Sequence, residues 1–401
     1  MKKEIREYIK KVLEVGADIK ENDALIIYMP EEMSDIEKII LELKEEYKIA
    51  EIIFIKTNYE KLYNFLSQNP TDTEILKFIE TYPLLKQTEH IKKIYFNDGL
   101  SEHCPYYRKI FNNYYDTYVR YLKINHEHNK DFFEQISPAP YILSSCPSKS
   151  WTLELFNDKT KINELWKLIT KTIPSVEEFK KINQQQQKIA KYLNELKINS
   201  LHFYTDKGTD FDIKLTKYAK WITYPKEINQ SKIYSNFPSY EIYTAPNYLS
   251  AEGKIILTKP SIINGCDKVY EATLIFSKGK AITCESNNET WNRVVLNKPN
   301  SMYRIGEIAL VPNDTPISKL NQTFGEILLD ENTGCHIALG DSLDECITTP
   351  KELLKTKGKK YYKFNVSEFH QDLTFGDETI CVEATSKGKT RTLIRNGNWQ
   401  L

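Results

Sequence analysis

The residues with the clearest potential for chemistry are two histidines and an aspartate in the last third of the chain. His336 lies in the segment DENTGCHIALG, after an apolar run and among small and acidic residues. His370 and Asp372 are two positions apart, so on a strand they would point to the same face and could reach one ion. Imidazole nitrogens and carboxylate oxygens bind divalent metals such as zinc, cobalt and manganese. These residues therefore predict a metal site.

Two glutamates can complete such a site. Glu307 lies in RIGEIALVP at the edge of a short apolar segment, and Glu241 stands between two prolines at the junction of a turn and a strand. Paired metals that share one carboxylate are an established route to hydrolysis, so we hypothesise a metallohydrolase. Each residue alone also has a simpler role, because single acids are mostly surface groups and a lone histidine in an apolar stretch is usually part of the core. The pair His370 and Asp372 could equally form a structural hydrogen bond.

Other reactive patterns are weaker. Cys335 precedes His336, but neighbours in a strand point to opposite faces, so a nucleophilic dyad is not expected. His126 and His128 lie in a polar run that is better explained as a solvated helix end. The basic stretch 351–363 is better explained as a lysine-rich loop than as a nucleic-acid contact.

Composition excludes several classes of function. The chain has 401 residues with 55 basic and 55 acidic side chains, so it has no net positive charge to hold a phosphate backbone, and nucleic acid is not an expected partner. It contains no glycine-rich phosphate-binding motif and no apolar run near the roughly 20 residues of a membrane span. The first 18 residues mix charges throughout, unlike a signal peptide, and seven cysteines without a C-x-x-C pair argue against a disulfide framework. We expect a cytoplasmic protein without membrane contact.

Hydrophobic periodicity predicts two domains. Over residues 1–199, helical patterns (5–15, 34–47, 73–81, 106–122) alternate with strand patterns (24–29, 51–55, 94–96, 141–145), which predicts an α/β domain with a mostly parallel sheet. Three more helices are expected at 151–156, 161–170 and 175–196. From residue 201 the pattern changes to short strands bounded by Gly, Pro, Asn or Asp. Residues 200–401 therefore predict an α+β domain that carries the metal site.

Nearly the whole chain resembles the M29 family of metalloaminopeptidases, the group of aminopeptidases T and S (PepS). The resemblance is strongest in four ordered segments, which are NFPSYEIYTAP, RIGEIALVP, PISKLNQTFGEILLDENTGCHIALG and SEFHQDLTFG. It implies a homodimer that removes the amino-terminal residue from short peptides with two divalent ions, of zinc, cobalt, manganese or magnesium. The family's metal ligands would fall on Glu241, Glu307, His336, His370 and Asp372, with Glu307 bridging both ions and with Glu307 and Glu241 as the catalytic residues.

One position departs from the family pattern. The family carries a tyrosine seven residues after the histidine of the DEN-x-x-CH segment, where this chain has Leu343. Loss of a hydrogen-bond donor at a reacting centre typically lowers the rate by on the order of a hundred- to a thousand-fold. Two alternatives to the aminopeptidase therefore stay open. One is a specialised metal-dependent amide or peptide hydrolase, or a related enzyme of a dedicated pathway, and the other is a catalytically silent metal-binding dimer.

Overall fold

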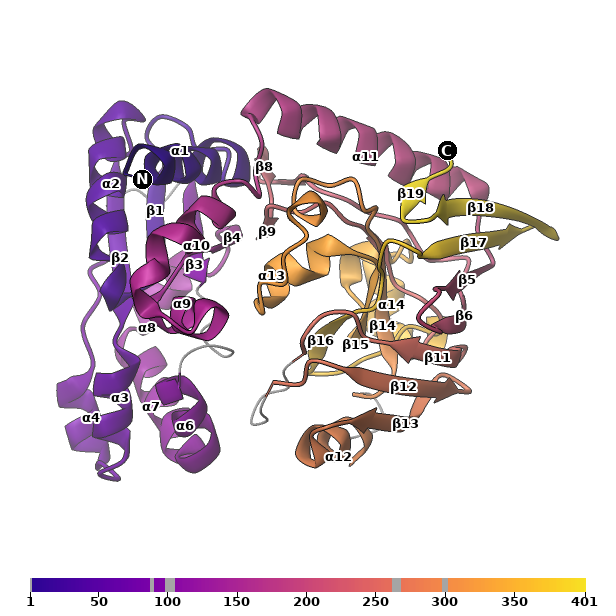
Figure 1. The fold of residues 1–401 in the computed structure, drawn as a ribbon. Coiled ribbons are helices and arrows are strands. Elements are labelled where there is room, and N and C mark those ends of the chain that lie inside the picture. Colours follow the sequence, from indigo (N-terminus) through magenta and orange to yellow (C-terminus); the bar gives the residue numbers. More distant parts are fainter. Residues whose placement is uncertain (1, 87–89, 98–104, 262–267, 298–301) are drawn as a thin grey trace. The chain divides into compact units, whose positions relative to one another are not determined.

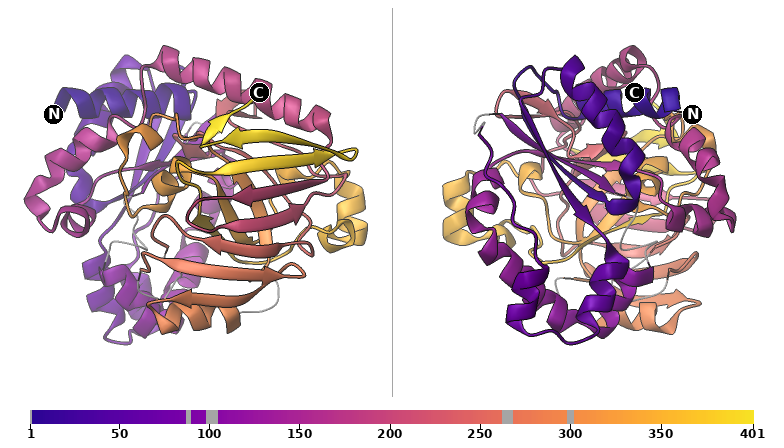
Figure 2. Two further views of the ribbon diagram at one scale, coloured as in Figure 1. Left: turned by 45° about the vertical axis from the view of Figure 1, so that its right-hand side comes forward. Right: turned by 90° about the vertical axis from the view of Figure 1, so that its left-hand side faces the viewer.

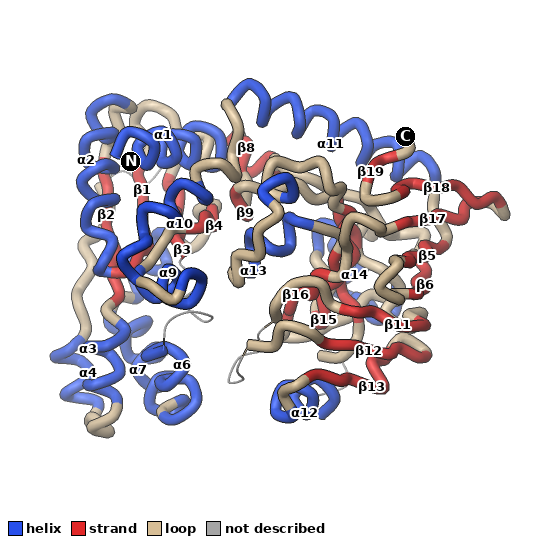
Figure 3. The backbone as a smooth tube through the Cα atoms, viewed as in Figure 1, coloured by secondary structure: helices blue, strands red, loops and turns tan. Residues whose placement is uncertain are grey.

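The computed structural model describes residues 2–86, 90–97, 105–261, 268–297 and 302–401. The chain forms two compact units, one made of Met1–Val176 and Pro225–Pro238 and the other of Glu177–Tyr224 and Ser239–Leu401 (Figure 1). Helices predominate in the first unit and strands in the second (Figure 3). This combination confirms the predicted fold class, an α/β domain followed by an α+β domain.

A five-stranded parallel sheet forms the centre of the first unit, with the strand order β2-β1-β3-β4-β9. Its inner strands are apolar and buried because helices flank the sheet, as expected of parallel sheets. Ile26, Ile94 and Ile142, one from each of three adjacent strands, have no exposed surface. The strands are β1 (Ala24–Pro30), β2 (Glu51–Thr57), β3 (Ile91–Asn97), β4 (Tyr141–Ser145) and β9 (Asn236–Phe237), and β7 (Lys226–Ile228) pairs separately with β8 (Ser231–Ile233).

The helices of the first unit follow the predicted pattern with two differences. The single helix expected at 106–122 is two helices separated at Tyr114, after two asparagines, which are poor helix formers. The short helices α3 and α8 were not predicted. The helices are α1 (Lys2–Lys11), α2 (Ser34–Glu46), α3 (Tyr59–Leu66), α4 (Asp72–Phe78), α6 (Pro105–Asn113), α7 (Tyr115–His128), α8 (Lys130–Ile136), α9 (Lys149–Phe156) and α10 (Ile162–Ile169).

The second unit contains an eight-stranded antiparallel sheet in the order β13-β12-β11-β6-β5-β17-β18-β19, which Figure 2 shows in its left view. Residues on its inner face alternate with exposed ones, as at Phe211 and Ile213 of β6. The strands are β5 (Ser200–Tyr204), β6 (Asp210–Lys214), β11 (Glu252–Ile256), β12 (Ala272–Ser277), β13 (Lys280–Ser286), β17 (Cys381–Ser386), β18 (Lys389–Arg395) and β19 (Asn398–Trp399), and the helices are α11 (Val176–Leu196), α12 (Glu289–Asn297), α13 (Ile327–Asp330) and α14 (Lys351–Lys357).

A four-stranded antiparallel sheet, β10-β14-β15-β16, packs on this core. It is built from β10 (Ile242–Thr244), β14 (Ile305–Leu310), β15 (His336–Gly340) and β16 (His370–Thr374). Alternate residues of these strands belong to the same hydrophobic core as the large sheet, among them Ile242, Ile308, Leu310, Ile337, Leu339 and Leu373. The other face of the small sheet therefore carries the polar residues of its strands.

The helix α11 belongs to the second unit, whereas the sequence placed a domain boundary after it, at residue 199. The physical reason is its apolar face, because Ile189, Ala190 and Leu193 are buried in the core of the second unit. The segment 225–238 also returns to the first unit, where β9 pairs with β4. None of the helices in the described parts of the chain is both long and apolar enough to cross a bilayer.

Candidate metal centre

The polar face of the small sheet brings together four of the predicted site residues. In register, Glu307 of β14 pairs with Ala338 of β15, which pairs in turn with Asp372 of β16. Directly opposite residues of antiparallel strands point to the same face, so Glu307 and Asp372 stand on either side of a small alanine. His336 and His370 lie on the same face because they are two positions from Ala338 and from Asp372.

A bulge at Gly306 gives Glu307 this orientation. The register of β14 against β15 shifts between Ile305 and Glu307, so one extra residue of β14 is accommodated there. Ile305 consequently faces the core while Glu307 faces the site. A Cβ at Gly306 would collide with the backbone carbonyls of Gly340 and Asp341, so the bulge requires glycine at this point.

Glu241 immediately precedes β10, and hydrogen bonds hold both its own backbone and that of its neighbour Tyr240. The Tyr240 amide donates to Asn332 Oδ1 at 2.6 Å, and the Thr223 hydroxyl donates to the Glu241 carbonyl at 2.8 Å. The Ser239 hydroxyl donates to Glu241 Oε1 at 3.2 Å. Because these bonds fix both backbone and side chain, the carboxylate is oriented before any ligand binds.

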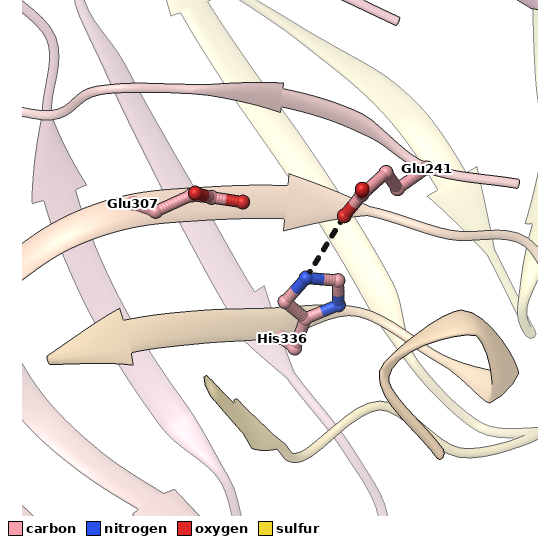
Figure 4. Close-up of side chains that lie close together, drawn as sticks. All are labelled: Glu241, Glu307 and His336. Carbon is pink, nitrogen blue, oxygen red and sulfur yellow. Dashed lines mark ion pairs between the residues drawn. The ribbon is translucent and has the colours of Figure 1, made fainter. Parts of the chain in front are cut away.

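The predicted residues converge in the structure. His336 Nε2 lies 3.1 Å from Glu241 Oε2, and Figure 4 shows these two groups and Glu307 pointing toward one another. One ligand atom of each of these three residues lies within 4.8 Å of the other two. His370 Nε2 lies 3.6 Å from both Glu307 Oε2 and Asp372 Oδ1. All five residues that the sequence singled out therefore belong to one cluster.

The structure adds Glu331, which sequence reasoning did not single out. Glu331, His336 and Asp372 form a second group of potential ligand atoms within 4.8 Å of one another. Glu331 lies in the one-turn helix η5 (Glu331–Thr333), and only 4 % of it is exposed. In the sequence, its position in DENTGCH, five residues before His336, could have marked it as a candidate ligand. An acid near a histidine in sequence does not show where its side chain points, so the fold was needed to place it.

Both histidines direct the same ring nitrogen into the cluster. His336 Nδ1 lies 3.3 Å from the carbonyl of Gly334, and His370 Nδ1 lies 3.3 Å from the carbonyl of Asp341. A backbone acceptor holds the proton on Nδ1, which leaves the Nε2 lone pair directed at the carboxylates. This is the arrangement that metal-binding histidines adopt.

Burial and charge shift the pKa values of the cluster strongly. Burial raises the pKa of Glu307 to about 8, with Glu241 and Asp372 adding to the shift against the opposing effect of His370. Burial and neighbouring carboxylates also raise the pKa of Glu331. Burial would lower the pKa of each histidine, but the carboxylates outweigh it and raise the pKa of His336 to about 9 and that of His370 to about 10. The cluster therefore holds protons that a cation would displace.

The chemistry of the cluster fits divalent cations. Four carboxylates face two imidazoles, so the cluster without its protons carries an excess of negative charge, and buried excess charge is costly unless protons or cations balance it. The fully buried Nε2 of His336 makes no hydrogen bond of acceptable direction to any of the described residues. An oriented lone pair among carboxylates is a ligand set for zinc, cobalt or manganese.

Two tyrosines lie beside these carboxylates. Burial raises the pKa of Tyr224 well above its usual value, and the charge of Glu241 is the next largest cause. Tyr243 shows the same direction for the same first reason, followed by the effect of Tyr224. Cys335 is buried on the opposite face, and burial raises the pKa of its thiol to about 12, so it is not an activated nucleophile.

Comparison with known proteins identifies the family. The chain is 25 % identical to aminopeptidase AmpS of Bacillus subtilis over 98 % of this chain and 97 % of that protein. It is 28 % identical to aminopeptidase PepS of Streptococcus thermophilus over 66 % of each chain, and 31 % identical to aminopeptidase T of Thermus thermophilus over 52 % of this chain and 50 % of the relative.

Two solved structures share the fold. AmpT of Thermus thermophilus aligns over 100 % of both chains with a TM-score of 0.81 and 21 % identity. A 2,5-dihydroxypyridine dioxygenase of Pseudomonas putida aligns over 99 % of this chain and 96 % of its own, with a TM-score of 0.51 and 12 % identity. The family model described as thermophilic metalloprotease (M29) matches residues 1–399. The chain therefore belongs to the M29 metalloprotease family.

Proposed function

We propose that this protein is a metal-dependent aminopeptidase that removes the amino-terminal residue from short peptides with two divalent cations. The observation that carries the proposal is the cluster of oriented imidazoles and buried carboxylates on one face of the small sheet. The family and its named aminopeptidase relatives support the same reaction class.

Glu241, Glu307, His336, His370 and Asp372 would hold the cations, together with Glu331. Glu307 is the candidate for a shared ligand, because it belongs to the group with Glu241 and His336 and also lies 3.6 Å from His370. An imidazole Nε2 has one lone pair, whereas a carboxylate has two oxygens and can serve two ions. When bound, the cations would supply positive charge that polarises the scissile carbonyl and lowers the pKa of a water molecule.

The carboxylates of the cluster would also act directly on the substrate. Two divalent cations balance the charge of the four carboxylates, so recognition of the free amino group of a peptide would depend on a carboxylate oxygen that binds no cation and accepts a hydrogen bond from the amine. In hydrolysis, the water oxygen bonds to the carbonyl carbon, the carbon–nitrogen bond breaks, and the proton lost by water goes to the leaving amine. The carboxylate of Glu241, which accepts a hydrogen bond from the Ser239 hydroxyl, would carry that proton.

The test is a metal-replete screen of free-amine dipeptides and tripeptides against the same peptides with acetylated amino termini. We expect cleavage of the free-amine peptides only, loss of activity with a chelator, and about two ions per chain by elemental analysis. Glu307→Ala should abolish cleavage, whereas Glu383→Ala on β17 of the large sheet should not. Chelator-resistant cleavage would overturn the mechanism.

Leu343 favours a second candidate, a metal-dependent hydrolase acting on one specialised peptide or amide. Loss of a phenol would change which substrates are cleaved more readily than it would change the cation ligands. Two bound ions with no turnover across the peptide screen, but turnover of another amide, would favour this candidate.

We further propose a cytoplasmic homodimer, as the family resemblance implies. Multi-angle light scattering on the purified protein should give twice the mass of one chain, and a monomer at micromolar concentration would contradict the homodimer.

A further inference from the structure

A buried asparagine lies between two segments of the cluster. Asn332 has no exposed surface and follows Glu331 in the one-turn helix η5. Its side-chain oxygen accepts a hydrogen bond from the Tyr240 amide at 2.6 Å, and Tyr240 directly precedes Glu241. Its side-chain nitrogen donates to the Leu328 carbonyl at 2.8 Å and lies 3.5 Å from Glu331 Oε1. One side chain therefore contacts the surroundings of two candidate ligands.

The partners of Asn332 require a donor and an acceptor on one short side chain. The Tyr240 amide can only donate and the Leu328 carbonyl can only accept, so the two bonds determine which way the Asn332 amide faces. Aspartate has the same size, but it would direct an oxygen at the Leu328 carbonyl and at the carboxylate of Glu331. Because Tyr240 is 1 % exposed, its amide would lack a partner if the Asn332 oxygen were removed.

The contacts of Asn332 lead to different groups of ligand atoms. Glu241 belongs to the first group of three and Glu331 to the second. The other candidate ligands lie within strands of the small sheet, where ladder hydrogen bonds fix the backbone. Glu241 instead precedes β10, and Glu331 lies in a single helical turn. The placement of these two carboxylates therefore depends on hydrogen bonds from side chains.

We propose that Asn332 is a positioning residue that fixes the spacing of Glu241 and Glu331, and so assembles both groups of ligand atoms before a cation binds. The inference rests on the proposed aminopeptidase function. Asn332 bonds to groups of the protein and takes no part in the covalent steps. Its effect on the reaction passes through Glu241, which would carry the proton of the water, and through Glu331, which would hold a cation.

A second buried asparagine provides a matched control. Asn129, between α7 and α8 of the first unit, is 4 % exposed. Its side chain also joins two segments, because it accepts from the Tyr82 amide at 2.8 Å and donates to the Glu80 carbonyl at 2.9 Å. Asn332→Ala and Asn129→Ala thus remove the same groups from similarly buried positions. A general loss of stability should appear in both variants.

Cation binding and kinetics separate the two asparagines. Asn332→Ala should weaken binding of cobalt or zinc by roughly 10- to 100-fold in competition with a chromogenic chelator. With the cation saturating, its kcat should fall by at least about tenfold while KM changes by less than about threefold, because Glu241 is displaced from the reacting groups. Asn129→Ala should change none of these values by more than about threefold. An equal loss in both variants would overturn the inference.

Hydrogen exchange tests the positioning role without turnover and without cations. In the wild type, the Tyr240 amide should be protected before any cation is added, because its bond to Asn332 is already formed. Asn332→Asp retains an acceptor oxygen and should keep this protection, whereas exchange in Asn332→Ala should be at least about tenfold faster. Rapid exchange of the Tyr240 amide in the cation-free wild type would overturn the inference even if neither variant folds.

Failure of the proposed function can be told apart from failure of the positioning role. A wild type that binds no cation and cleaves no free-amine peptide would overturn the aminopeptidase, and the inference with it. Cation binding and cleavage that are normal in the wild type and equally normal in Asn332→Ala would overturn the positioning role alone.

Discussion

Cation binding should release protons, and the number released can be worked out from the cluster. The pKa values of His336, about 9, and His370, about 10, mean that both rings carry a proton at pH 7.5 before a metal binds. Glu307, with a pKa of about 8, is about three-quarters protonated at the same pH. A cation needs the free lone pairs of all three groups. We therefore expect these three groups to release about two to three protons per chain when the site fills, and any proton on Glu331, whose pKa burial also raises, adds to that number.

The direction in which cation affinity changes with pH follows from these raised pKa values. Protons compete with the cation wherever the pH lies below the pKa of the ligand, so apparent affinity should rise between pH 6 and about pH 8 to 10 and then level off. Titration calorimetry at pH 7.5, repeated in buffers of different ionisation enthalpy, gives the number of protons directly. Glu307→Gln should lower that number by about one, because the variant removes a titrating group and one anion that raises both histidine pKa values.

The control for this experiment is Glu383→Gln, a carboxylate of the large sheet that should leave proton release unchanged. Release of less than one proton per chain at pH 7.5 would refute the reasoning. So would an affinity that falls as the pH rises from 6 to 8, because the histidines would then not be protonated in the metal-free protein.

Three further predictions concern the elements that build the site and the first unit. Glu331→Gln should weaken cation binding by roughly 10- to 100-fold without unfolding the protein, measured by competition with a chromogenic chelator. Gly306→Ala should displace Glu307, because the new Cβ would meet backbone carbonyls at the bulge, and should lower metal content measured by elemental analysis. Asp23→Asn should lower the free energy of unfolding by about 3 to 5 kcal/mol in urea titrations, because it leaves the ammonium of Lys92, 2.7 Å from Asp23 and 2 % exposed, without its buried counter-ion.

Each of these variants has a matched control. Glu378→Gln changes an exposed acid and should bind cations normally. Gly388→Ala has open space around the new Cβ, so its cost should come from the backbone alone and metal content should be preserved. Replacing Asp23 and Lys92 together by apolar residues should cost less than Asp23→Asn. Contrary results would be normal cation affinity in Glu331→Gln, full metal content in Gly306→Ala, or a loss below about 1 kcal/mol in Asp23→Asn.

Local patterns in the sequence predicted most elements of the first unit. The runs that became β1 and β4 are apolar and bounded by polar or turn residues, so their type and limits could be read directly. The helix α3 was missed because its sequence, YEKLYNFL, is short and rich in aromatic residues that also suit strands, although Leu62 and Leu66 form a buried face at helical spacing. The limits of α11 were predicted closely, but the unit it joins depends on contacts with distant strands.

The glutamine tract of α11 also depends on distant contacts that the sequence pattern did not predict. Its glutamines suggested a solvated face, and Gln184, Gln185 and Gln187 are exposed. Gln186 is buried, and its side chain donates to the Glu241 carbonyl at 3.5 Å. Identical residues in one tract therefore have different environments, because helical geometry turns only one of them toward the core.

The sequence by itself determined which side chains are available and which of them share a strand face. The two-residue spacing of His370 and Asp372 and the resemblance of four segments to one family needed no coordinates. Only the tertiary structure decided that Glu241, Glu307 and His336 meet, because strand pairing brings together residues that are far apart along the chain. It alone placed Glu331 in the cluster. Burial then raised the pKa of Glu307, since the cost of desolvating a charge depends on everything packed around it.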